Sequence, residues 1–104
     1  MSFSLRVQTA EARAAEAAMA HQAQISAAVE RHVEAQAQAL GYGSATTLAG
    51  YLGSSVAPWA AEARAFVAWR DAVWTKVFAL STAADTPDAL TPEAVIAALP
   101  AWKA

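Results

Sequence analysis

Residues 58–80 read PWAAEARAFVAWRDAVWTKVFAL, and this stretch decides the fold. It contains no glycine, and its one proline is its first residue. Large apolar side chains recur every three or four residues, which is the spacing of one helix face. They are Trp59, Phe66, Val67, Val73, Trp74, Val77 and Phe78, and three of the chain's four tryptophans lie here. The pattern predicts a tryptophan-rich central helix over residues 55–82.

The composition of the whole chain favours helices. A length of 104 residues indicates one domain. Glycine and proline number four each, and much of the 57% hydrophobic content is alanine, the best helix former. We therefore predict a single all-α domain, in which a long N-terminal helix packs on the central helix and two short helices complete the fold.

Charge and hydropathy exclude several classes of protein. A net charge of -2 is too acidic for a general nucleic-acid-binding protein. No uncharged apolar stretch reaches about 18 residues, so we expect no membrane span. The N-terminus lacks the charged and then apolar pattern of a signal peptide. The absence of cysteine excludes disulfides and thiolate metal sites, and it fits a protein of the cytosol.

Local signals place the other elements. Residues 1–8 alternate apolar and polar side chains, which fits a short strand, an ordered N-terminal arm or a frayed terminus. Capping residues, glycines and prolines then divide the rest into a long helix over 9–40, a short helix over 44–52, the central helix over 55–82 and a last short helix over 92–99. The predicted N-caps are Thr9, Ser44, one of Ser54 and Ser55, and Thr91, and Gly41 is the predicted stop of the long helix.

The long helix is too long for the body of a compact domain. About thirty residues at about 1.5 Å each give a rod of about 45 Å, whereas a compact chain of this size has a diameter of about 34 Å. The first half of the helix is rich in alanine, which lets helix backbones approach closely. We predict a homo-oligomer, with a dimer favoured, and the interface candidates are Ala14, Ala17, Ala18 and Ile25. The alternative is a solvated alanine-rich helix.

Catalytic, metal and cofactor sites are not predicted. His21 and His32 lie eleven residues apart, whereas a metal-binding pair on a helix needs a spacing of three or four. Glu30 and Glu34 share a helix face, which is typical of a solvated surface. The serines lie at predicted caps, and Gly41 and Gly43 follow a helix rather than a strand, which excludes a dinucleotide-binding loop.

Arg70 and the tryptophans have both a structural and a functional interpretation. The neighbours of Arg70 in the helix are largely apolar, so its guanidinium either stacks on a ring, pairs with an acid such as Glu62, or anchors a partner protein. By helical spacing Trp59 and Trp74 are predicted in the core. Trp69 is predicted to lie off the buried stripe, so Trp69 and Arg70 are the candidate partner-binding residues.

Residues 38–80 resemble a segment found in small proteins of tailed bacteriophages and prophages. Those proteins are usually encoded among tail and tail-fibre genes, and the segment also ends longer tail-associated proteins. The shared residues, in order, are Gly41, Tyr42, Ser44, Tyr51, Glu62, Ala63 and the run from Trp69 to Trp74. The segment usually has an acid after the first tyrosine, where this chain has Gly43, so no role of that acid carries over. The resemblance implies a phage tail context and no catalysis.

Together these features predict a non-enzymatic tail- or tail-fibre-associated protein, either an assembly factor or a minor virion component. It would act by protein–protein contact, in the cytoplasm of the bacterial host or in the virion, with no cofactor. One alternative is a small dimeric regulatory or adaptor module that binds a defined cellular protein. An enzyme or metal protein is the other alternative, and it would need a cluster of ionisable groups that the sequence does not show.

Overall fold

The fold is a set of helices joined by short loops. A computed structural model describes residues 9–85 and 89–103. The helices, in chain order, are α2 (Ala10–Ala39), α3 (Ala45–Ala49), the 3-10 helix η1 (Gly50–Gly53), α4 (Ala57–Ala83) and α5 (Pro92–Ala98). Within these two ranges there is no strand, which confirms the all-α prediction. The predicted arm over residues 1–8 lies outside the described residues.

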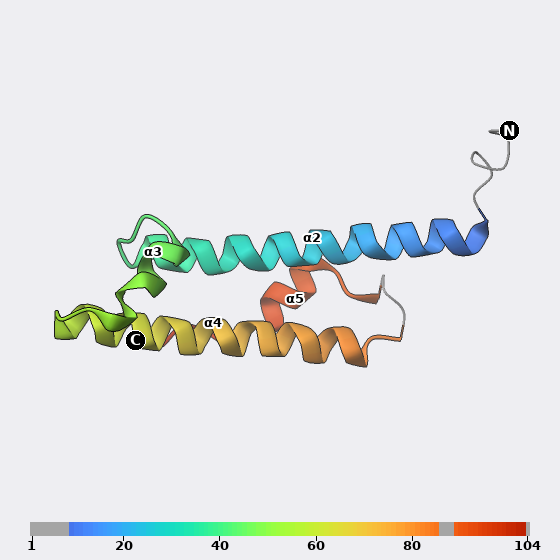
Figure 1. Cartoon of the computed structure of the whole chain (residues 1–104). Coiled ribbons are helices and arrows are strands. Elements are labelled where there is room, and N and C mark those ends of the chain that lie inside the picture. The colour runs from blue at the N-terminus through green and yellow to red at the C-terminus, as the bar shows by residue number, and fades with distance from the viewer. Residues whose placement is uncertain (1–8, 86–88, 104) are drawn as a thin grey trace, which may run out of the picture.

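Two long helices set the shape of the molecule (Figure 1). Helices α2 and α4 run side by side in opposite directions, and α3 and η1 connect them at one end. Helix α5 packs against both long helices on one side of the pair, and the chain after it runs back toward the connected end. Most close backbone contacts between helices run through the short elements rather than directly between α2 and α4. The result is elongated, with extents of 63 × 31 × 18 Å.

Side-chain caps fix the starts of three helices. The hydroxyl oxygens of the capping residues accept backbone N–H bonds of 3.0 Å three residues along the chain, which satisfies donors that have no partner inside the helix. The caps are Thr9 for α2, Ser44 for α3 and Thr91 for α5, as predicted.

Gly41 ends α2 with a reversal of the chain. Its φ of 96° is open to glycine and costly for other residues. The N–H of Gly41 donates to the carbonyl of Gln38 at 2.9 Å, and the N–H of Tyr42 donates to the carbonyl of Ala37 at 3.1 Å. These two bonds are those of a Schellman motif, so the predicted stop is confirmed.

The start of α4 differs from the prediction of a serine cap. Val56 is the N-cap, and its side chain makes no capping hydrogen bond. The hydroxyl of Ser54 accepts instead from the N–H of Val56 at 3.0 Å, which closes a turn before the helix. Pro58 lies in the first turn of α4, as predicted, where its missing N–H costs no helical bond.

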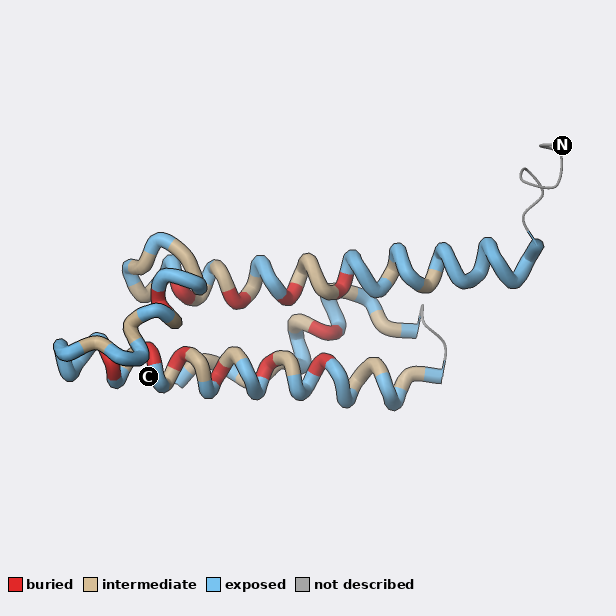
Figure 2. The backbone as a smooth tube through the Cα atoms, viewed as in Figure 1, coloured by how far each residue is buried: buried red, intermediate tan, exposed pale blue. Residues whose placement is uncertain are grey.

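One apolar core lies between the long helices (Figure 2). Leu48 from α3 and Val95 from α5 enter it from the two short helices. The long helices supply the rest, namely Ile25, Val29, Val33 and Ala37 from α2, and Ala63, Phe66, Trp69, Val73 and Val77 from α4. Burial stops at Ile25, so the first half of α2 has no counterpart in the core.

Candidate functional site

The N-terminal half of α2 extends beyond the end of α4 (Figure 1). Every residue from Thr9 to Ala17 is exposed, and Ala18 is half-buried (Figure 2). Ala14 and Ala17 are therefore accessible to another molecule. Ile25 is 4% exposed in the chain's own core, which corrects its placement at an interface between copies.

Trp69 is part of the core, so the prediction that it lies off the buried stripe is wrong. It is 8% exposed. Its indole Nε1 donates a hydrogen bond of 2.9 Å to the carbonyl of Pro100. The ring packs against those of His32 and Phe66, with centroids 5.8 Å away in both cases. Trp102 lies edge-on to it, at 5.8 Å and 88°.

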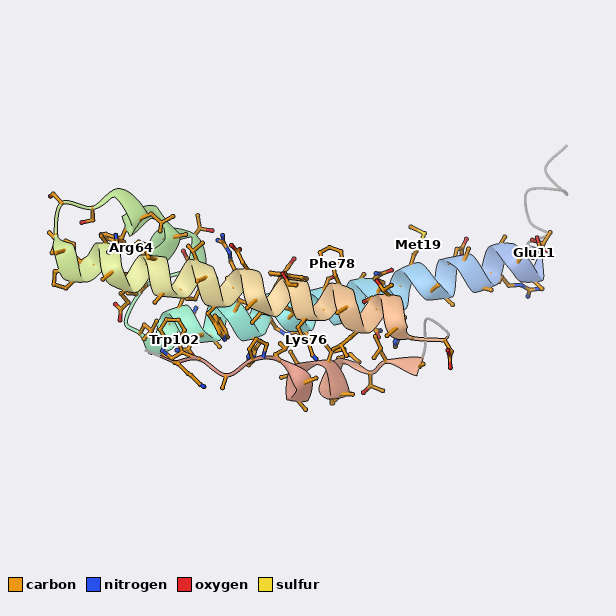
Figure 3. The ribbon with its side chains drawn as sticks, turned by 90° about the horizontal axis from the view of Figure 1, so that it is seen from below. Glu11, Met19, Arg64, Lys76, Phe78 and Trp102 are labelled. Atoms are coloured by element: carbon orange, nitrogen blue, oxygen red, sulfur yellow. The ribbon has the colours of Figure 1, made fainter. Side chains whose placement is uncertain are left out.

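The C-terminal segment explains this burial. Helical spacing within α4 places Trp69 beside the stripe that faces α2, as the sequence indicated. The chain after α5 returns along that flank of α4 and covers it (Figure 3). The contacts of Pro100 and Trp102 with Trp69 span about thirty residues of sequence, and a pattern within one helix carries no information on them.

Trp59 is not in the core, in contrast to the prediction. It is 49% exposed. The first turn of α4 extends past the connected end of α2. The ring of Trp59 there lies edge-on to that of Tyr51 in η1, at 5.6 Å. Trp74, the other predicted core tryptophan, is half-buried and packs against the core cluster.

Arg70 pairs with its neighbour in the chain. Its Nη2 lies 3.6 Å from Oδ1 of Asp71, and its side chain is 36% exposed. Such a solvated pair contributes between 0 and about 1 kcal/mol to stability. The expected partner Glu62 is engaged elsewhere, as an acceptor for Tyr42. A role for Arg70 in binding a partner stays a prediction.

A tyrosine–glutamate contact ties the connected end together. The Tyr42 hydroxyl donates to Oε1 of Glu62 at 2.8 Å, and its ring lies 5.6 Å from that of Tyr51. The hydrogen bond to Glu62, followed by burial and by the negative charge of that carboxylate, raises the pKa of Tyr42 above its usual value of 10.0. Nearby, Oε1 of Glu34 accepts from the N–H of Ala45 at 3.0 Å, so this carboxylate supports the start of α3 rather than only facing solvent.

The residues that carry the resemblance to phage proteins therefore have structural roles. Tyr42, Tyr51 and Glu62 meet where the long helices are joined. Gly41 ends α2 and Ser44 caps α3. Further along the segment, the buried members belong to the core and are Ala63, Trp69 and Val73. In this chain these residues thus form the joint between α2 and α4 and part of the core.

A small cleft lies where the core ends. Its volume is about 190 Å³, and Ala18, His21 and Ile25 of α2 line it together with Ser81 at the end of α4 and Leu90 of the returning chain. The Nε2 of His21 donates a hydrogen bond to the carbonyl of Leu90. Each of the two histidines thus has a partner within the fold, since His32 packs on Trp69.

Two large apolar side chains stand out from the surface near this end. Met19 of α2 is 73% exposed, and Phe78 of α4 is 69% exposed. Both project from the same side of the helix pair, opposite the side that α5 and the C-terminal segment cover (Figure 3). This side and the exposed half of α2 are the candidate contact surfaces.

Residues 9–85 and 89–103 contain neither a metal-binding cluster nor a membrane-spanning helix. No group of three or more histidine, aspartate and glutamate side chains there is arranged to bind a metal ion. None of the helices in these ranges has the length and apolar character that crossing a membrane requires. Comparisons of the chain found no matching family model, curated protein or solved structure.

Proposed function

We propose that this chain is a non-enzymatic protein associated with the tail or tail fibre of a bacteriophage or prophage, and that it acts by protein–protein contact as a homodimer. It works as an assembly factor or a minor virion component, in the host cytoplasm or in the particle. The observation that carries the proposal is the N-terminal half of α2, which stands clear of the core.

Helix stability supports a partner for this half. Isolated helices of fewer than about 12–15 residues are marginal in water, and most helices are held by packing of one face. All nine residues from Thr9 to Ala17 are exposed, so this part of α2 contributes no buried face to the described core. A second copy of the same alanine-rich surface would supply it, because small side chains allow two helices to approach closely.

The phage tail context rests on the resemblance of residues 38–80. The residues that carry it lie at the joint between α2 and α4 and in the core, so the proposed common feature is a hairpin of helices. A fold that presents a long helix from a rigid hairpin suits a protein that recruits fibrous partners.

Charge introduced on the exposed half of α2 tests the dimer. The variant Ala14→Glu/Ala17→Glu should convert a dimer to a monomer in light scattering, because both positions are exposed and outside the core. Ala18 is left intact because it lines the cleft. The matched control is Ala61→Glu/Ala68→Glu, which adds the same charge at exposed alanines of α4 and should leave the mass unchanged. A wild-type chain that is already monomeric, or a variant of unchanged mass, would reject the interface.

The context has a separate test. Particles induced from the host of this gene and purified should contain the chain by immunoblot if it is a virion component. A chain found only in the lysate, and bound there to an immature tail or fibre protein, identifies an assembly factor. A chain bound to neither, in a genome without neighbouring tail genes, would refute the phage context.

A further inference from the structure

We propose that the surface around Trp69 is a binding site for an extended peptide with a tryptophan two residues after a proline, and that the chain's own C-terminus occupies this site in the structure. We call residues 99–103 the strap. The inference goes beyond the proposed dimer and does not depend on it, because it concerns a different face of the molecule and a different ligand.

The contacts of the strap are those of a bound peptide. Trp69 Nε1 donates to the carbonyl of Pro100 at 2.9 Å, and any peptide backbone can offer such an acceptor. Two residues later the ring of Trp102 lies edge-on to Trp69 and 6.3 Å from the ring of Phe66. Aromatic pairs of this geometry contribute beyond the area that they bury. One backbone acceptor and one ring, at a fixed spacing, thus define the ligand.

The strap is weakly held compared with the helices. It follows the end of α5 and has no regular secondary structure. Ala101 and Lys103 are exposed, and Trp102 is half-buried. Within the described ranges, the bond from Trp69 is the one hydrogen bond that a side chain makes to it. Segments with few buried contacts open at a lower free energy than the core, so a competing peptide can replace the strap without unfolding the rest.

An open groove continues from the strap along α4. It has a volume of about 480 Å³ and is lined by Ala72, Thr75, Lys76, Ala79, Ala98 and Pro100. The position of Ala98 and Pro100 places this groove on the side that precedes the proline of a bound peptide. Lys76 is exposed there, and no described carboxylate pairs with it.

Competition between the strap and an added peptide tests the site. The probe is a fluorescein-labelled peptide ALPAWK, the sequence of residues 98–103, measured by anisotropy against the full chain. In the wild type the tethered strap acts at an effective concentration of the order of millimolar, which lowers the apparent affinity for the probe. The variant Trp102→Ala should bind the probe at least about tenfold more tightly than the wild type. The control peptide ALPAAK should bind neither protein.

Each outcome decides the matter. Equal binding of the probe to the two proteins, binding of ALPAAK comparable to that of ALPAWK, or no binding to a Trp102→Ala variant that is helical by circular dichroism would overturn the proposal. If Trp102→Ala does not fold, Trp102→Phe replaces it, and its strap should be displaced at a lower probe concentration than that of the wild type; equal concentrations overturn the proposal. The mass of the protein in light scattering reports separately on the dimer, so the two proposals can fail independently.

Discussion

Replacing Trp69 with alanine should cost a large part of the stability of the fold. Truncation of a buried tryptophan typically costs 3–5 kcal/mol, through lost burial and the cavity that remains. Trp69 fits this class because it is 8% exposed, contacts three rings and donates a hydrogen bond to Pro100. A domain of about 100 residues has a total stability of about 5–15 kcal/mol. The loss is thus about a fifth of the total or more.

Trp59 provides the matched control, because it is the same residue type on the same helix. Its side chain is 49% exposed, and its one described ring contact is with Tyr51. Trp59→Ala should cost about 1–2 kcal/mol, since roughly half of the burial is lost. If Trp69 instead lay on the surface, as the helical stripe predicts, its truncation would cost no more than that of Trp59.

Urea unfolding followed by far-ultraviolet circular dichroism measures both losses, and it avoids the change in fluorescence that any tryptophan replacement causes. Trp69→Phe is the milder variant, expected to cost about 1 kcal/mol for the lost hydrogen bond plus the reduced packing. A double-mutant cycle of Trp69→Phe with Trp102→Ala should give a coupling of about 0.5–1.5 kcal/mol. Additive losses, or a Trp59 variant less stable than the Trp69→Ala variant, would refute the arrangement of the strap on α4.

Two further predictions concern the connected end. Gly41→Ala should destabilise the fold by about 1 kcal/mol in urea unfolding, because its φ of 96° disfavours a side chain although no atom lies within 4 Å of an added Cβ, whereas Gly43→Ala, with the same free space and no positive φ, should have little effect. Tyr42→Phe should remove the hydrogen bond to Glu62 and lower the free energy of unfolding. This loss of stability relative to the wild type should have its full size below pH 10.0 and become smaller above it. The raised pKa gives this sign, since the unfolded phenol loses its proton first as the pH rises. A deficit that grows above pH 10 would contradict it.

The extents of the helices could be predicted because their signals are local. Thr9, Ser44 and Thr91 cap helices through hydroxyls three residues from their donors. Gly41 ends α2 through bonds that span three and five residues. Short spans of sequence contain both partners of each such interaction. The start of α4 was mistaken by two residues because two serines compete there, and Ser54 closes a turn rather than a helix.

The placement of the tryptophans could not be predicted in the same way. Spacing within a helix assigns a side chain to a direction, but burial depends on what lies in that direction. Trp59 lies in the first turn of α4, where its described ring contact is with Tyr51, whereas Trp69 meets the strap. Both errors come from contacts distant in sequence. The protruding half of α2 was predictable, because it follows from the length of a rod compared with the size of a compact domain.

Residues 38–80 have mainly structural roles in this fold, which limits what a protein with a similar segment would have in common with this chain. The residues on which the proposed phage resemblance is based hold the joint and the core, and the buried ones are not available to a partner. The exposed half of α2 precedes this segment and the strap follows it, whereas most of the groove lining and the exposed Phe78 lie within it. Proteins that share the segment would therefore share a hairpin of helices, and a partner bound through the exposed half of α2 would depend on the residues that precede it. It follows that exchanging residues 9–24 between two such proteins should exchange the oligomeric state and leave the joint intact.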